Sequence, residues 1–363
     1  MTIITPEIEA GAGGLADYTL RLIEHWPVDT NFQILTRRLP QNKVTGPHVT
    51  GLLPSSEEEI FRALFAAKGP VLIQYSAFGY DSAGNPEDLI NAVTRWKSFG
   101  NSSRLVVMFH EIWTFVPFWN RRFLAQKRHR RLIGRLALAA DVVVTSTASQ
   151  AAHLERVSGR SDVSVLPVGS NITPHPISKS ARDETAAVIF GLAPSRIRAL
   201  RSLRGTLRKL ASAKTLTRIT TIGQGDNSGE SALLEDFKLS AGFQQLGACS
   251  EAVVAREFEQ AAFAISDQDP LSYTKSGTLM AYAQHGLNVI SPFASATSGE
   301  PFSIFFSPTD LQGGVSPEQR EERARLLKNW QARTSSWPSI ADFFLAALRL
   351  PESSLSATRR ETN

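Results

Sequence analysis

A run of four residues in the last third of the sequence combines groups that can hold a phosphorylated ligand. The run consists of Lys275, Ser276, Gly277 and Thr278. It follows an apolar stretch at 262–265 and opens a segment of helical spacing that ends before Gly286, a natural residue for a helix end. The N–H groups and dipole of a helix start, with hydroxyls and a lysine beside them, can bind a diphosphate. We expect such a site here, with a capped helix and a solvated lysine as the alternative.

A glycine-rich loop near the beginning of the sequence is the second candidate. Gly13 and Gly14 follow the first expected strand, at 2–5, and precede a helix expected at 15–26. Because glycine has no Cβ, such a loop lets a ligand approach the backbone and the N–H groups of the helix start. The spacing is not G-x-G-x-x-G, which disfavours a dinucleotide. Asp17, three residues further on, is a candidate general base, and a turn without a ligand is the alternative.

His110 and Glu111 form the third candidate, at the carboxyl end of an apolar strand expected at 104–109. Histidine can donate a hydrogen bond to a sugar hydroxyl or take up a proton, and a carboxylate can act as a base. A histidine that only caps the next element is the alternative interpretation. We include both residues among the candidate catalytic groups.

Two loops in the second half complete the set. Arg196 follows a strand expected at 187–190 and could clamp a phosphate oxygen, a role that Arg198 could also take. Gly223 and Gln224 follow a strand expected at 218–222 and could line a pocket for a nucleotide base. The alternatives are a surface arginine and an ordinary loop.

The elements that position these residues alternate between short apolar strands and helices. Further strands are expected at 31–36, 71–74, 141–145, 163–166 and 288–291, and further helices at 57–66 and 87–97. Such short apolar runs are typical of strands buried on both faces of a parallel sheet. Ligands bind at the carboxyl ends of the strands in such sheets, which is where every candidate above lies. The sequence therefore predicts an α/β fold with open parallel sheets.

The length of 363 residues predicts two domains. The polar stretch 170–183 has the composition of a linker, so we place the boundary near residue 178. The run Ser316-Pro317-Glu318-Gln319 is a helix-capping signature that predicts a helix to about Arg333. A last helix is expected at roughly 339–349.

Composition excludes several classes of protein. The single cysteine, Cys249, rules out a disulfide framework and a cysteine-based zinc site. The first residues lack the basic and apolar regions of a signal peptide, and there is no run of 18 apolar residues to span a membrane. We therefore expect a cytoplasmic protein with a frayed polar tail at 351–363.

The net charge of +5 is modest, but seven cations and no acid lie between Arg121 and Arg135. If the segment 121–139 is helical, its basic face could lie on an anionic membrane surface. The alternative is the solvated face of a packed helix. No nucleic-acid partner is expected, because no aromatic-interleaved module accompanies the cations.

Several segments in a fixed order resemble glycosyltransferases of the GT-B fold, in particular the family 4-like group (glycosyltransferase group 1 type). They are GAGGLADYTLRL, HEIWTF, ADVVVTSTASQAAHL, VSVLPVGSNI and SGTLMAYAQHGLNVIS, and they cover roughly residues 8–300. The resemblance implies two Rossmann-like domains facing a cleft. Residues 1–178 would bind the acceptor, 179–330 would bind the nucleotide sugar, and helices within 331–350 would cross back.

The resemblance also implies an activity. The enzyme would be a hexosyltransferase-like, retaining, metal-independent transferase in polysaccharide or glycolipid assembly. It would need no cofactor besides its nucleotide-diphosphate sugar and would use a carbohydrate or lipid-linked acceptor. Gly13 and Gly14 would lie near the donor phosphates or the acceptor, and His110 beside the transferred sugar. Arg196 and Lys275 would bind the diphosphate, on the inner face of the membrane if the basic segment binds there.

The sequence departs from the family at two positions. Family 4 enzymes often carry two glutamates that correspond to Tyr273 and Ala281 here. Their absence leaves two alternatives open: a sugar-nucleotide epimerase of the same fold, and a non-catalytic binding protein. An inverting enzyme would need a base, for which Asp17, His110 and Glu111 are the candidates.

Overall fold

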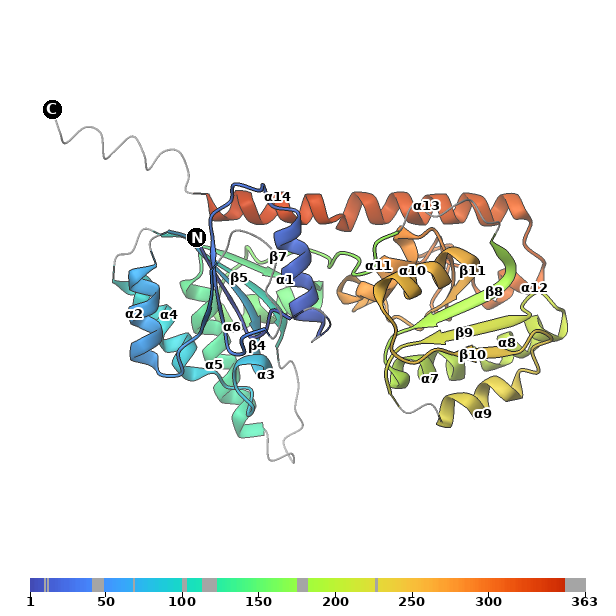
Figure 1. Ribbon diagram of the computed structural model, residues 1–363, viewed down its shortest axis with the longest axis horizontal. Coiled ribbons are helices and arrows are strands. Elements are labelled where there is room, and N and C mark those ends of the chain that lie inside the picture. Colours follow the sequence, from blue (N-terminus) through green and yellow to red (C-terminus); the bar gives the residue numbers. More distant parts are fainter. Residues whose placement is uncertain are drawn as a thin grey trace. The chain divides into compact units, whose positions relative to one another are not determined.

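The computed structural model describes residues 1–9, 11, 13–40, 49–67, 69–99, 103–112, 123–174, 182–225 and 228–349. The chain forms two compact units, each built around one parallel sheet (Figure 1). The first unit contains 1–167 and the residues from 337 onward, and the second contains 168–336. The expected α/β fold with two Rossmann-like sheets is confirmed.

The first unit has a seven-stranded sheet in the order β3-β2-β1-β4-β5-β6-β7, and every pairing in it is parallel. Short apolar runs form its centre, since β1, β4 and β5 are buried nearly throughout. The strands are β1 (Thr2–Thr5), β2 (Gln33–Thr36), β3 (Val49–Leu52), β4 (Val71–Ser76), β5 (Leu105–Glu111), β6 (Val142–Thr145) and β7 (Ser164–Val165).

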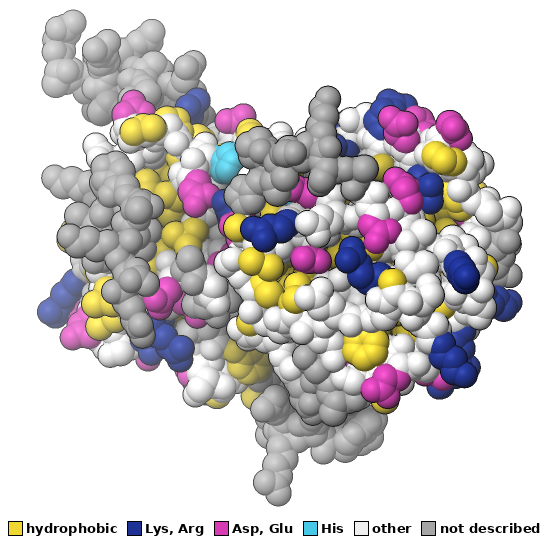
Figure 2. Space-filling view, turned by 45° about the vertical axis from the view of Figure 1, so that its right-hand side comes forward, with side chains coloured by type: hydrophobic (Ala, Val, Ile, Leu, Met, Phe, Trp, Pro, Cys, Tyr) yellow, Lys and Arg dark blue, Asp and Glu magenta, His cyan; other side chains and the backbone are white. Residues whose placement is uncertain are grey.

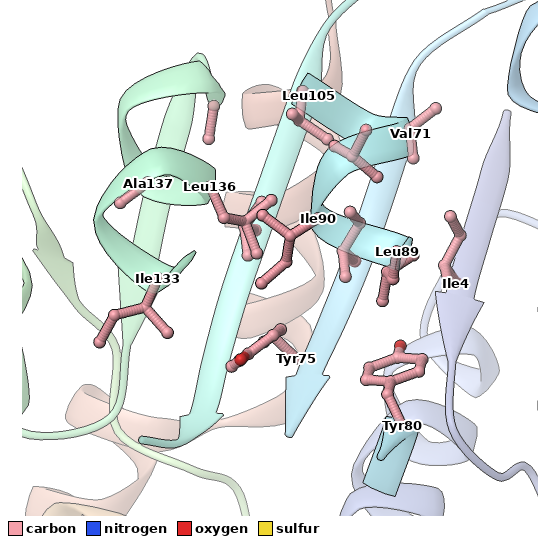
Figure 3. Packing of buried hydrophobic residues seen from close by; sticks show 14 of the residues in the cluster. Ile4, Val71, Tyr75, Tyr80, Leu89, Ile90, Leu105, Ile133, Leu136 and Ala137 are labelled. Atoms are coloured by element: carbon pink, nitrogen blue, oxygen red, sulfur yellow. The ribbon is translucent and has the colours of Figure 1, made fainter. Parts of the chain in front are cut away.

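Helices cover this sheet in two groups. The first comprises α2 (Glu57–Ala66), α4 (Glu87–Ser98), α5 (Phe123–Ala139) and α6 (Ala148–Ser158), which contact one another in that order. Side chains of α2, α4 and α5 pack on Ile4, Ile73 and Tyr75 in one apolar cluster, part of which Figure 3 shows. The second group comprises α1 (Gly14–Glu24) and α14 (Trp337–Leu348), which pack together. The short α3 (Ala77–Tyr80) follows β4 directly.

The second unit has a five-stranded parallel sheet in the order β10-β9-β8-β11-β12. Its strands are β8 (Asp183–Phe190), β9 (Arg218–Ile222), β10 (Phe243–Gln245), β11 (Ala261–Ile265) and β12 (Asn288–Ile290). Its helices are α7 (Ala193–Ser202), α8 (Arg204–Ser212), α9 (Ser228–Asp236), α10 (Glu251–Gln260), α11 (Gly277–Gln284), α12 (Pro308–Gln312) and α13 (Pro317–Ser335). A 3₁₀ turn, η1 (Tyr273–Lys275), precedes α11.

Most expected elements are present, and two short strands were not expected. β3 and β10 lie at the edges of their sheets, and neither contains a continuous apolar run, since β3 reads VTGL and β10 reads FQQ. The capping box predicted at Ser316 is present and begins α13, which belongs to the second unit. The chain returns to the first unit at Trp337, so α14 is the segment within 331–350 that crosses back.

The boundary predicted near residue 178 and the tail at 351–363 both lie outside the described residues. The contacts divide the chain between Pro167 and Val168. No helix among the described residues is both long and apolar enough to cross a membrane. On the face of the molecule shown in Figure 2, cations and acids are interspersed, so the positive net charge does not gather in one patch there.

Candidate functional site

The second unit contains a cavity of about 270 Å³ at the carboxyl ends of β8 and β11. It lies where an open parallel sheet is expected to bind ligands. Its lining residues come from the end of β8, from α7, from the segment after β11 and from α11. Those that bear on its chemistry are Gly191, Arg196, Arg198, Asp267, Gln268, Ser276, Thr278 and Tyr282. The cavity thus brings together the predicted donor-binding residues Arg196, Ser276 and Thr278.

The start of α11 forms one wall of this cavity. Ser276 is the N-cap, and its Oγ accepts a hydrogen bond of 3.2 Å from the N–H of Leu279. The N–H groups of Gly277 and Thr278 donate to no acceptor among the described residues. They are therefore available to an anion, which the helix dipole also favours. Lys275 is exposed at the end of η1 and is not part of the cavity lining.

Arg196 lies in the wall of the cavity, but its guanidinium is already paired. Nε and Nη2 donate to the two carboxylate oxygens of Glu230 at 2.7 and 2.8 Å, and the two side chains are only 1% and 0% exposed. Nη1 donates to the carbonyl oxygens of Gly191 and Gln224. Such a bidentate pair is strong and geometrically specific. Arg196 therefore ties together the loops that follow β8 and β9, and Glu230 neutralises its charge.

Gly223 brings the same two loops into close contact. A Cβ at this position would lie 2.0 Å from the carbonyl oxygen of Gly191, and φ of Gly223 is +128°. Both facts require glycine here. The neighbouring Gln224 is exposed, and its carbonyl oxygen also accepts the N–H of Ala193 at 3.0 Å. The predicted base-binding loop is therefore held by its backbone, which leaves the Gln224 side chain outside.

Arg198 lies at the edge of the cavity and is arranged differently from Arg196. Its side chain is 64% exposed, and Nε donates to Asp267, which is 11% exposed, at 2.5 Å. An exposed ion pair of this kind is weak and exchanges easily with other partners. Of the two arginines, Arg198 is the one whose charge a ligand in the cavity could reach without breaking a buried pair.

Aromatic and apolar packing occupies the positions of the missing family glutamates. The ring of Tyr273 meets Phe302 edge-on, with 5.3 Å between the ring centroids, and also contacts Trp330. Partial burial raises the pKa of the Tyr273 hydroxyl. Ala281 is completely buried in α11. A glutamate at position 273 would lose these ring contacts, and one at position 281 would place a carboxylate in the buried interior of the second unit.

In the first unit, His110 occupies an irregularity at the end of β5. The register of β4 and β5 pairs Tyr75 with Phe109 and then Ser76 with Glu111, so His110 is an inserted residue. Such a bulge re-aims a side chain. The ring Nε2 lies 2.6 Å from Oε1 of Gln74, and the edge of Tyr18 meets the ring at a centroid distance of 4.8 Å.

Tyr18, Gln74 and Trp337 complete this cluster, and none of them was expected from the sequence as a site residue. Trp337, the first residue of α14, packs edge-on against Tyr18 at 5.1 Å. The hydroxyl of Tyr18 and Nε2 of Gln74 are buried without a partner in the described ranges, and burial raises the pKa of that hydroxyl. Gln74 could have been noticed, because it is a polar residue within the buried strand VLIQYS.

The other predicted residues of the first unit make contacts separate from those of His110. Glu111 is exposed and accepts a hydrogen bond of 3.1 Å from Ser76. Asp17 accepts the N–H of Gly11 at 2.9 Å and so closes the glycine loop. A Cβ on Gly13 would lie 2.7 Å from a carboxylate oxygen of Glu7, whereas Gly14 has open space around it.

In the described ranges, no group of three or more His, Cys, Asp or Glu side chains is arranged to hold a metal ion. The predicted residues fall into one group in each unit. The second unit contains Arg196, Gly223, Gln224 and the residues 275–278, and the first contains Gly13, Gly14, Asp17, His110 and Glu111.

No protein-family model matches this chain, and the comparison with curated proteins gives no match. Solved structures match over nearly the whole length. A glycosyltransferase from Rickettsia africae ESF-5 is 12% identical, with 95% of this chain and 97% of that chain covered and a TM-score of 0.64. WaaG, a glycosyltransferase involved in lipopolysaccharide biosynthesis, is 12% identical, with coverages of 97% and 100% and a TM-score of 0.58.

A protein proposed to be a UDP-N-acetylglucosamine 2-epimerase, from Listeria monocytogenes, matches as well. It is 12% identical, with 100% of this chain and 97% of that chain covered and a TM-score of 0.53. At these identities the likeness establishes the fold. The chain therefore has the GT-B fold that its sequence predicted, with a parallel sheet in each of its two units.

Proposed function

We propose that this protein is a glycosyltransferase that moves a sugar from a nucleotide-diphosphate donor to a hydroxyl of a carbohydrate or lipid-linked acceptor, in polysaccharide or glycolipid assembly. The observation that carries the proposal is the cavity of the second unit, where the open start of α11 meets an arginine at the ends of the sheet strands. The GT-B fold, shared with lipopolysaccharide and other glycosyltransferases, supports it.

In this proposal the diphosphate lies against the start of α11. The N–H groups of Gly277 and Thr278 and the hydroxyl of Thr278 donate to its oxygens, and Arg198 turns from Asp267 to join them. Lys275 supplies a further positive charge from outside the cavity. When the bond between the sugar and the diphosphate breaks, these donors stabilise the negative charge of the leaving group. Arg196 acts through the loop geometry that it maintains with Glu230.

On the acceptor side, we propose that His110 contacts the transferred sugar, positioned by its hydrogen bond to Gln74 and by Tyr18. The acceptor hydroxyl forms the new bond to the sugar and loses its proton. In a retaining reaction, which the family resemblance implies, that proton can leave with the diphosphate. In an inverting one, Glu111 or Asp17 would be the base.

Isothermal titration of the full chain with UDP, ADP and GDP tests the donor site. We expect one of them to bind, and we expect about tenfold weaker binding for Thr278→Ala and for Arg198→Gln, because each variant removes a hydrogen bond to a charged group. Arg325→Gln is the matched control, since Arg325 is an exposed arginine paired with Glu322 on α13. The proposal fails if no nucleoside diphosphate binds, or if both variants bind as the wild type does.

A sugar-nucleotide epimerase is the second candidate, favoured by the matching 2-epimerase structure. An epimerase would convert the donor without any acceptor, whereas a transferase would leave it intact or slowly hydrolyse it. Incubation of the bound donor alone, followed by separation of the sugar epimers, distinguishes the two activities. A non-catalytic protein would bind the donor and never consume it, even with acceptors present.

We also propose that the protein acts in the cytoplasm, with the basic segment 121–135 facing an anionic membrane surface. Some arginine side chains of this segment already contact the neighbouring helix α4. Arg128 pairs with Glu87 of α4, and Arg135 donates to Asn91 and Thr94 of the same helix. Lys127 and Arg131 are exposed, and they are the described cations that the proposal relies on.

A further inference from the structure

The first unit contains a cavity of about 340 Å³ that none of the roles above uses. It lies beyond the carboxyl ends of β2, β3 and β4 and beside the start of α4, again the edge at which parallel sheets bind ligands. Its lining residues are Arg37, Leu53, Ser55, Ile60, Tyr80, Asp81, Ala83, Asn85, Pro86, Glu87, Asp88, Leu89 and Arg128. The segments that supply them are spread over more than 90 positions of the sequence.

The surface that lines this cavity is mostly polar, and buried apolar side chains lie behind it. Leu53, Ile60, Tyr80 and Leu89 are buried and belong to the core cluster. Tyr80 lies toward the carboxyl end of β4 (Figure 3), and its hydroxyl donates to the carbonyl oxygen of Gln74, which fixes the ring. A hollow at the carboxyl ends of parallel strands with a mostly polar lining suits a polar ligand such as a sugar. Its volume suits a ligand of about one sugar ring.

The rim carries charges of both signs, and only some of them have a partner within the described part of the chain. Arg128 forms an ion pair with Glu87, and Asp81 accepts the N–H of Asn85 at 2.8 Å. Arg37 makes no ion pair or hydrogen bond within the described part of the chain, and neither does the Asp88 side chain. The rim thus offers one unused cation and one unused carboxylate on different elements, Arg37 after β2 and Asp88 in α4.

From this arrangement we propose that the cavity binds a monosaccharide carrying one anionic group, with the anion at Arg37 and sugar hydroxyls donating to Asp88 and Asp81. Carboxylates accept hydrogen bonds from hydroxyls, whereas a guanidinium pairs with phosphate or carboxylate. Arg37 and Asp88 are both exposed, so an anionic, hydroxylated ligand can replace their hydration with direct contacts, which a neutral apolar molecule cannot do. The role of this cavity as an acceptor site rests on the proposed function, whereas the binding of an anionic sugar to it does not.

Titration of the full chain with the 6-phosphates and the uronates of glucose, galactose and mannose tests the inference. The parent neutral sugars and inorganic phosphate are titrated alongside, each with and without a bound nucleoside diphosphate. We expect at least one anionic sugar to bind more tightly than its neutral parent. Arg37→Gln should weaken that binding about tenfold, because it removes a charged hydrogen bond, and Asp88→Asn should weaken it as well. Neutral-sugar binding should not change in Arg37→Gln.

Arg62→Gln is the matched control, since Arg62 is an exposed arginine of α2 that lines neither this cavity nor the donor cavity. The inference is overturned if no anionic sugar of the panel binds, if neutral and anionic sugars bind alike, or if Arg37→Gln and Asp88→Asn bind as the wild type does. Binding of a nucleoside diphosphate in the same preparation would then still support the donor site. If an anionic sugar binds but none of the nucleoside diphosphates does, the cavity is a sugar site that is independent of the proposed transfer reaction.

Discussion

At the scale of single residues, two arginines two positions apart have opposite environments. Arg196 is buried in a bidentate pair with Glu230, and Gln245 donates a further hydrogen bond of 3.3 Å to the same carboxylate. Arg198 is exposed and forms an ion pair with Asp267, whose side chain is largely buried. Because a buried charge must keep its partner while an exposed one can exchange it, we assign loop support to Arg196 and ligand contact to Arg198.

The Glu230→Gln variant tests the supporting role of Arg196. It should lower the free energy of unfolding by about 3–5 kcal/mol, since it leaves the buried guanidinium without a compensating charge. Chemical denaturation followed by circular dichroism measures the change. Asp267→Asn, which disrupts the exposed pair of Arg198, is the comparison and should cost at most about 1 kcal/mol. Equal effects of the two variants would show that the Arg196–Glu230 pair has no special structural role.

At the scale of elements, the loops after β8 and β9 and the start of α11 define the donor cavity. Gly191 donates its N–H to the carbonyl oxygen of Ile222, and the N–H of Gly223 bonds to Gly247 beyond β10. The conformation of these loops is therefore held by backbone hydrogen bonds between the segments that follow neighbouring strands. The cavity shape should be more sensitive to a Cβ at their contact than to most surface side chains.

Gly223→Ala should weaken nucleoside diphosphate binding and lower stability by about 1–3 kcal/mol. The new Cβ would collide with the Gly191 carbonyl, and alanine is strained at the positive φ. Gly205→Ala is the matched control, because Gly205 lies in α8 with open space around it. The control should be neutral or slightly stabilising. Calorimetric titration combined with thermal unfolding measures both effects, and an unchanged Gly223→Ala protein would contradict the close contact of the loops.

The helix α5 carries the proposed membrane contact. Sedimentation with vesicles containing an anionic lipid should show binding that decreases as salt is raised. Lys127→Gln with Arg131→Gln should weaken it about fivefold for each cation removed. A control with two exposed arginines changed on other helices, Arg62→Gln with Arg325→Gln, keeps the same net charge. If control and test variants bind alike, the attraction is not specific to α5.

At the scale of the whole molecule, the first unit is completed by a segment distant in sequence, whereas the second unit is one continuous stretch of chain. The last helix, α14, packs on α1 and β5 of the first unit, and its Trp337 contacts Tyr18 beside His110. In the second unit, α13 packs on α11, and Ser335 donates to the sulfur of Met280. The C-terminal helices therefore support both candidate sites from behind. Each unit contains one of the two cavities to which a ligand is proposed to bind.

The sequence by itself determined the features that depend on neighbouring residues. Short apolar runs specified the parallel sheets, because their burial is favourable wherever the strand is central. The helix start at 275–278, the capping box at Ser316 and the absence of acids at Tyr273 and Ala281 were equally readable. The edge strands β3 and β10 were not predicted, since they are short and lack an apolar run.

Only the tertiary structure decided which charges are paired. Arg196 and Arg198 look alike in sequence, and the fold alone places Glu230, 34 positions later, against the first of them. In the same way, Arg37 and Asp88, which form no ion pair within the described part of the chain, line one cavity because the segments that follow parallel strands lie at one edge of the sheet. Helix caps and apolar periodicity act between near neighbours in the chain. Charges interact through space with whichever partner the fold supplies, so their roles could not be derived from spacing.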